Sequence, residues 1–161
     1  MNVLVRKFVD CLHWLENATL VTAFVGMLCL AVMQIVLRNF FEAGVIWADS
    51  LLRMLILWIA LLGAMVATRE RNHINIDAIS RYFPTVSQKL IDSVVALLSA
   101  LICATAGWYA YLFVRMEFED QSMAFAAVPT WTTEVIIPLA FFVMAIRFAI
   151  QVVTNWAGRK P

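Results

Sequence analysis

Four long apolar runs constrain this chain more than any other feature. A hydrocarbon core about 30 Å thick needs about 20 apolar residues in a helix. The runs cover about residues 18–37, 46–68, 92–114 and 134–154, and residues 18–37 carry no charge. Because lipid offers the backbone no hydrogen-bond partners, each run is expected to be helical. The predicted fold is therefore an all-α integral membrane protein with four transmembrane helices in a single membrane domain, residues 1–161.

The composition supports a bilayer as the solvent. The chain is 63% hydrophobic and 14% charged, whereas soluble domains are about 45–50% apolar and about 25% charged. The net charge is only +1 and the basic residues are scattered, which argues against nucleic-acid binding. The acidic residues Asp10 and Glu16 precede the first run, so we expect the N-terminus to be retained rather than cleaved as a signal peptide.

The placement of basic residues predicts the orientation. Cytoplasmic loops are enriched in Lys and Arg. With four spans, one side of the membrane receives eight basic residues: Arg6, Lys7, Arg69, Arg71, Arg81, Lys89, Arg159 and Lys160. The other side receives three: Arg38, Arg53 and Arg115. Both termini are therefore expected to be cytoplasmic, and Trp14, Trp47, Trp131 and Trp156 fall at span ends, as an interfacial aromatic belt would.

Two further segments have the pattern of short amphipathic helices at the membrane interface. One apolar helical face near the N-terminus consists of Leu4, Phe8, Cys11, Leu12 and Leu15. A second, between spans two and three, consists of Ile76, Ile79 and Phe83, and Pro84 ends it. Such faces bury their apolar side chains at the headgroup boundary. The sequence thus predicts interfacial helices at the N-terminus and between spans two and three.

Motifs for catalysis or independent transport are missing from the sequence. The first span has no carboxylate for proton coupling, and both histidines, His13 and His73, lie outside the spans. The cysteines Cys11, Cys29 and Cys103 are far apart and read as small hydrophobic residues. We therefore expect neither an enzyme nor a cofactor or metal site. A chain of this kind suits an accessory subunit that docks to a larger membrane protein.

Charged residues in or near the spans are the remaining functional candidates. Asp49 precedes Arg53 by four residues, so the two can pair on one helix face or contact a partner. Arg147 lies about 10 Å from the inner end of its helix at 1.5 Å per residue. It either snorkels to the headgroups or binds a buried partner or a lipid phosphate. His73 is either a surface polar group or a ligand.

Acidic residues gather on the predicted outer side. They are Glu42, Asp49, Glu117, Glu119, Asp120 and Glu134. Their irregular spacing is typical of a solvated acidic loop, although a cation funnel is the alternative.

A set of motifs in the chain resembles the small membrane subunit (DctQ-type) of tripartite ATP-independent periplasmic (TRAP) transporters. The motifs are Arg38, "WADSLLR" at 47–53, "LLGAMVATR" at 61–69, "HINID" at 73–77, and then "VPTW", Pro138 and Arg147. The resemblance covers essentially the whole chain. One departure is Ser50, which stands where the family often has a second acidic residue, so a role for that carboxylate does not carry over.

The resemblance implies a non-catalytic subunit of a bacterial inner-membrane transporter for organic acids. In that family a periplasmic binding protein delivers the substrate and a large membrane subunit moves it, driven by sodium, so sodium and substrate sites are expected in the large subunit. The candidate docking or interfacial residues are Arg38, Trp47, Asp49, Arg53, His73, Asp77 and Arg147. The candidate residues facing the binding protein are Glu117, Glu119, Asp120 and Trp131. Phospholipids are further expected partners, and the alternative function is a self-sufficient homo-oligomeric transporter or channel.

Overall fold

The computed structural model describes residues 3–41, 44–69, 85–125 and 128–156. The elements are α1 (Val3–Phe40), α2 (Ile46–Arg69), α4 (Thr85–Asp120), β1 (Met123–Phe125), β2 (Val128–Pro129), α5 (Thr130–Glu134) and α6 (Ile136–Trp156). Within these ranges four helical segments are long and apolar enough to cross a membrane: Cys11–Phe40, Trp47–Arg69, Leu90–Asp120 and Thr130–Asn155. The predicted fold class is confirmed.

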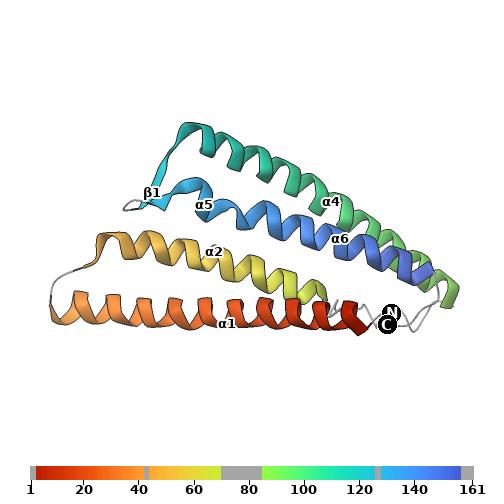
Figure 1. Ribbon diagram of the computed structural model, residues 1–161, viewed down its shortest axis with the longest axis horizontal. Coiled ribbons are helices and arrows are strands. Elements are labelled where there is room, and N and C mark those ends of the chain that lie inside the picture. The colour runs from red at the N-terminus through yellow and green to blue at the C-terminus, as the bar shows by residue number, and fades with distance from the viewer. Residues whose placement is uncertain (1–2, 42–43, 70–84, 126–127, 157–161) are drawn as a thin grey trace.

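The four long helices lie side by side in the order α1, α2, α6, α4 (Figure 1). The start of α1, the end of α2, the start of α4 and the end of α6 lie together at one end, called here the tail end. The opposite end, called here the hairpin end, carries α5 and the short antiparallel pair of β1 and β2. The positive-inside prediction assigns the tail end to the cytoplasm.

Small side chains allow α4 to pack closely on α6. Buried or half-buried positions on α4 recur every three or four residues: Ser93, Ala96, Ala100, Cys103, Gly107, Ala110 and Val114. Such residues let two helix backbones approach in a membrane, where van der Waals packing drives association. At Gly107 an added Cβ would lie 3.3 Å from the Cβ of Phe141 and from the ring of Phe142. The contact between α4 and α6 therefore depends on a residue without a side chain.

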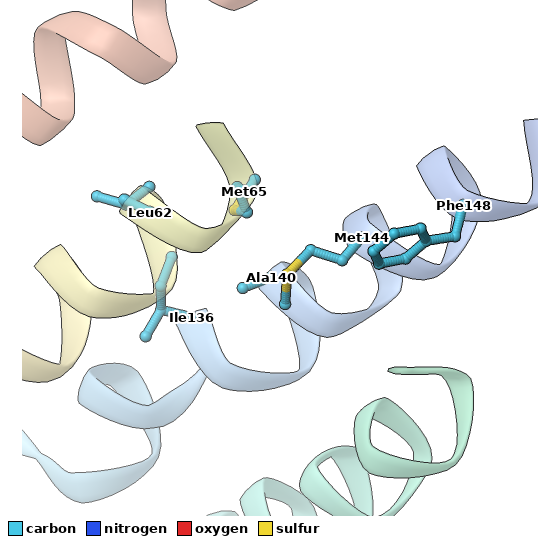
Figure 2. Packing of buried hydrophobic residues seen from close by; sticks show 6 residues of the cluster. All are labelled: Leu62, Met65, Ile136, Ala140, Met144 and Phe148. Carbon is cyan, nitrogen blue, oxygen red and sulfur yellow. The ribbon is translucent and has the colours of Figure 1, made fainter. Parts of the chain in front are cut away.

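A cluster of apolar side chains joins α2 to α6. Leu62 and Met65 of α2 pack with residues on one face of α6 (Figure 2). Those residues are Ile136, Ala140, Met144 and Phe148. Nearer the hairpin end, Nε1 of Trp58 donates a hydrogen bond to the carbonyl of Thr133 at 2.9 Å. Trp58 thus ties α2 to the segment that leads into α6.

Pro138 explains why α5 and α6 are separate. Proline has no N–H, so Pro138 cannot donate to the carbonyl of Glu134, and it is tolerated only in the first turn of a helix. The helix is interrupted at Val135 and resumes at Ile136. Leu139 then bonds weakly back to the carbonyl of Val135, at 3.4 Å.

The interfacial helices are the part of the fold prediction that the structure does not bear out. The N-terminal segment is helical but forms the first turns of α1, a single 38-residue helix. A separate helix lying along the membrane surface there is therefore not observed. The second predicted interfacial helix, together with His73 and Asp77, lies outside the described residues.

Replacement of Gly107 by Leu should destabilise the chain, because the added side chain collides with Phe141 and Phe142. Overpacking of this kind costs about 1–3 kcal/mol. Thermal unfolding in detergent should show a lower midpoint for Gly107→Leu. Gly26→Leu is the matched control, since nothing lies within 4 Å of a Cβ built at Gly26. Equal midpoints for the two variants would contradict the close packing of α4 on α6.

Candidate functional sites: two polar clusters and an acidic surface

An ion cluster ties three helices together at the tail end. Glu16 of α1 pairs with Arg147 of α6, with Oε1 and Nη2 2.5 Å apart. The same carboxylate pairs with Arg69 of α2, with Oε2 and Nη1 3.5 Å apart. The side chains of Glu16, Arg69 and Arg147 are 10%, 14% and 16% exposed. One carboxylate thus bridges two largely buried guanidinium groups.

Backbone and amide oxygens complete this cluster. Arg147 also donates to the carbonyl of Met65. Arg69 donates to the carbonyl of His13 at 3.4 Å and to Oδ1 of Asn17 at 3.1 Å. Arginine suits such a position because its five donors reach several acceptors at once. Glu16 faces both guanidinium groups, so the loss of its carboxylate would remove a counter-charge from Arg147 and from Arg69.

These contacts decide between the two readings of Arg147. Its guanidinium has a buried partner within the chain, so snorkelling to the headgroups is wrong. Glu16 is not among the site residues predicted from the sequence. The sequence does contain one signal for it. Glu16 directly precedes the first span, which places it at the membrane level predicted for Arg69 and close to the level predicted for Arg147.

Replacement of Glu16 by Gln should lower the free energy of unfolding by about 3 kcal/mol, because removal of one partner of a buried ion pair leaves an uncompensated charge. The measurement is chemical or thermal unfolding in detergent. Glu119→Gln is the matched control, because its pair with Arg115 is more than 60% exposed on both sides and such pairs contribute about 0–1 kcal/mol. A Glu16→Gln variant as stable as this control would refute a structural role for the cluster.

A second polar cluster holds the connection between α1 and α2 at the hairpin end. Arg38 pairs with Asp49 at 2.6 Å, and both side chains are about half exposed. The side chain of Gln34 is buried, and the residue is 4% exposed. Its Nε2 donates to the carbonyl of Val45 at 3.1 Å, and its Oε1 accepts the N–H of Val45 at 3.3 Å. Gln34 therefore satisfies both backbone groups of the residue that precedes α2.

Asp49 has a different partner from the one expected on its own helix. The predicted pair with Arg53 is wrong, because Asp49 faces α1 and binds Arg38, and it also accepts from Gln34 at 3.4 Å. In the first turn of α2 the carboxylate is also favoured by the helix dipole. Arg53 is exposed, and no hydrogen bond or ion pair joins it to another described residue. Trp47 is 45% exposed beside this cluster.

Of the predicted outer-side acids, Glu117, Glu119 and Asp120 lie at the end of α4 and Glu134 lies at the end of α5. Asp49 belongs to the second polar cluster, and Glu42 lies outside the described residues. Asp120 and Glu119 are exposed, and Glu119 pairs with Arg115 at 3.1 Å. Glu117 accepts a hydrogen bond from the hydroxyl of Ser122. The ring of Trp131 meets that of Phe118 edge-on, with centroids 5.4 Å apart. These residues share the hairpin end.

The described acids at the hairpin end lack the arrangement of a metal site. In the described ranges no three His, Cys, Asp or Glu side chains lie where they would hold a metal ion. Glu134 is half-buried, and its Oε2 accepts no hydrogen bond from a described residue. The described acids therefore form a surface rather than a coordination site.

Four apolar helices tied by internal polar clusters define a multi-pass membrane protein. The sequence model of the family described as "Tripartite ATP-independent periplasmic transporters, DctQ component" matches residues 27–158. The chain therefore belongs to the DctQ family. It is a small TRAP transporter subunit of the inner membrane, and as a transport component it is not an enzyme.

Three curated relatives show how this unit occurs in other proteins. The chain is 28% identical over 125 residues to a sialic acid TRAP transporter permease protein, SiaT, of Haemophilus influenzae (strain 86-028NP), covering 76% of this chain and 19% of that protein. It is 24% identical over 106 residues to the isethionate TRAP transporter permease protein DctMQ of Oleidesulfovibrio alaskensis, covering 65% and 17%. A putative TRAP transporter small permease protein of Haemophilus influenzae (strain Rd) is 26% identical over 77 residues, 48% of each chain. The chain thus spans less than a fifth of the first two relatives.

Proposed function

We propose that this chain is a non-catalytic scaffold for a large TRAP transport subunit. The observation that carries the proposal is that the buried polar groups of this chain bind other groups of the same chain. Glu16, Arg69 and Arg147 bind one another across three helices, and Gln34 binds the backbone of Val45. These groups are used to hold the helices together, and none of these contacts lines a path across the membrane.

The outer faces of the bundle fit a scaffold. The helices α1 and α4, at the two edges of the row, expose many large apolar side chains. Exposed apolar surface of this extent marks contact with lipid or with another membrane protein. A row of four helices exposes such surface over a wide area. When docked to a partner, this row would widen and stiffen that partner in the bilayer. Phospholipids would cover the faces that the partner leaves open.

The relatives support a large partner. In the sialic acid and isethionate permeases the matched region is less than a fifth of the protein, so most of each chain lies outside this unit. We assign substrate binding and sodium coupling to a large subunit of that kind. Both named substrates are organic anions, which supports organic acids as the substrate class here. This chain would contribute no cofactor.

Co-purification tests the scaffold proposal. The chain should bring down a large, many-span membrane protein when it is expressed with its neighbouring gene and isolated in mild detergent or nanodiscs. Liposomes containing this chain alone should show no uptake of organic acids and no ion flux. Reproducible flux through this chain alone would instead support a self-sufficient homo-oligomeric transporter or channel.

The hairpin end is the proposed contact surface for the substrate-binding protein. Glu119 and Asp120 are exposed there, beside the aromatic pair of Phe118 and Trp131. Glu117 is also part of this surface, although its hydrogen bond with Ser122 gives it a local structural role.

Charge reversal at the two exposed acids should weaken coupling to the binding protein. For Glu119→Lys with Asp120→Lys, we expect transport in the reconstituted complex to need a higher concentration of binding protein. Membrane insertion should be unchanged, because both side chains are already exposed. Lys7→Glu, at the tail end, is the control. An unchanged dependence on binding-protein concentration would exclude these acids from the contact surface.

A further inference from the structure

One exposed face of α2 combines an arginine with small residues. Arg53, Ile56, Ala60 and Ala67 are exposed, and Gly63 lies on the same face with nothing within 4 Å of an added Cβ. Their spacing of three, four, three and four residues after Arg53 places them along one stripe of the helix. This stripe is called here the α2 face. The part of the α2 face nearest the tail end, Ala60, Gly63 and Ala67, consists of small residues only.

The other long helices expose mostly bulkier side chains, although α1 also exposes the small residues Thr22, Gly26 and Cys29 along one face. On α1 the exposed large hydrophobic residues between the tail and hairpin ends include Val21, Phe24, Leu28, Val32 and Ile35. On α4 they include Val94, Leu98, Leu101, Ile102 and Trp108. On α2 the described ones are Trp47, Ile56 and Leu57. From Ala60 to Arg69, α2 thus exposes no large apolar side chain.

A glycine on an outward helix face has a physical cost that the described part of the chain does not offset. Glycine in a helix is less favourable than alanine by about 1 kcal/mol, and Gly63 has no close packing partner in the described part of the chain. In membranes, small residues four apart, such as Gly63 and Ala67, allow two helix backbones to approach closely. The α2 face therefore has the shape of a helix-packing surface.

Arg53 indicates the chemistry of the missing partner. It lies seven residues after Ile46, about 10 Å along the helix at 1.5 Å per residue. Arg38, Arg69, Arg115 and Arg147 each have an acidic partner, whereas no described residue pairs with Arg53. Arg53 falls within the candidate span Trp47–Arg69. A lipid chain cannot accept a hydrogen bond from a guanidinium, so a charge within a span is normally paired. A carboxylate on the neighbouring helix would supply the complementary charge.

We propose that the α2 face binds a transmembrane helix of the large transport subunit. That helix packs closely along Ala60, Gly63 and Ala67, and it carries an Asp or Glu level with Arg53. The inference rests on the proposed scaffold function and adds to it which face of the chain makes the contact. The face lies on the side of α2 away from Leu62 and Met65, and Arg53, Ile56, Ala60 and Ala67 are exposed on it.

A pair of glycine substitutions tests the shape of this surface. In the complex purified with the large subunit, Gly63→Leu should reduce the apparent affinity at least about tenfold, which corresponds to 1.4 kcal/mol. Gly26→Leu is the matched control, because Gly26 also has open space around an added Cβ and lies between the exposed small residues Thr22 and Cys29 of α1, on a face without an arginine. The unfolding midpoint of each variant alone should be no lower than that of the unmodified chain, because both added side chains enter open space. Equal affinity of Gly63→Leu and Gly26→Leu would overturn the proposal.

Arg53→Gln and a photo-crosslinker at Ala60 identify the occupant. Arg53→Gln should weaken the complex, whereas Arg115→Gln, whose pair with Glu119 is exposed, should not. The crosslinker should give an adduct with the large subunit. An adduct of two copies of this 18.2 kDa chain, or adducts with lipid alone, would overturn the assignment. If the unmodified chain binds no large subunit, the scaffold proposal itself fails; if it binds but neither substitution matters, only the assigned face is wrong.

Discussion

The bridge from Glu16 to Arg69 and Arg147 is the interaction on which the arrangement of the helices most depends. It joins α1, α2 and α6, and the three side chains are at most 16% exposed. Helices in a bilayer gain little from hydrophobic burial because lipid chains are equally apolar. A charged contact that lipid cannot replace is therefore an effective way to select one neighbour. It also fixes which ends of the helices meet.

The remaining contacts extend this arrangement into a row. The seam of small residues that includes Gly107 brings α4 onto α6, while Trp58 and the Leu62–Met65 cluster hold α2 against α6. Gln34 and Asp49 close the connection from α1 to α2. The polar groups of these clusters thus join the helices to one another, and the faces turned outward are apolar. That division is what a scaffold in a membrane needs, and the α2 face with Arg53 is its exception.

Sequence reasoning recovered the helices but not their pairings. Apolar length alone predicts four spans, because a helix that crosses a bilayer must be about 20 residues long. It also identified Arg147 and Asp49 as unusual charges. Their partners were not predictable, because Glu16 and Arg147 are 131 residues apart and meet only once the helices are packed. The local pair of Asp49 with Arg53 was wrong for the same reason, since Arg38 reaches Asp49 from another helix.

The most direct test of this account is a double-mutant cycle on Glu16 and Arg147. The free energy of unfolding would be measured in the same detergent for the unmodified chain, Glu16→Gln, Arg147→Gln and the double variant. Residues in direct contact show coupling of about 0.5–3 kcal/mol, whereas distant residues are additive within about 0.5 kcal/mol. The account predicts coupling at the upper end of that range. Additive effects would contradict the claim that this contact organises the helices.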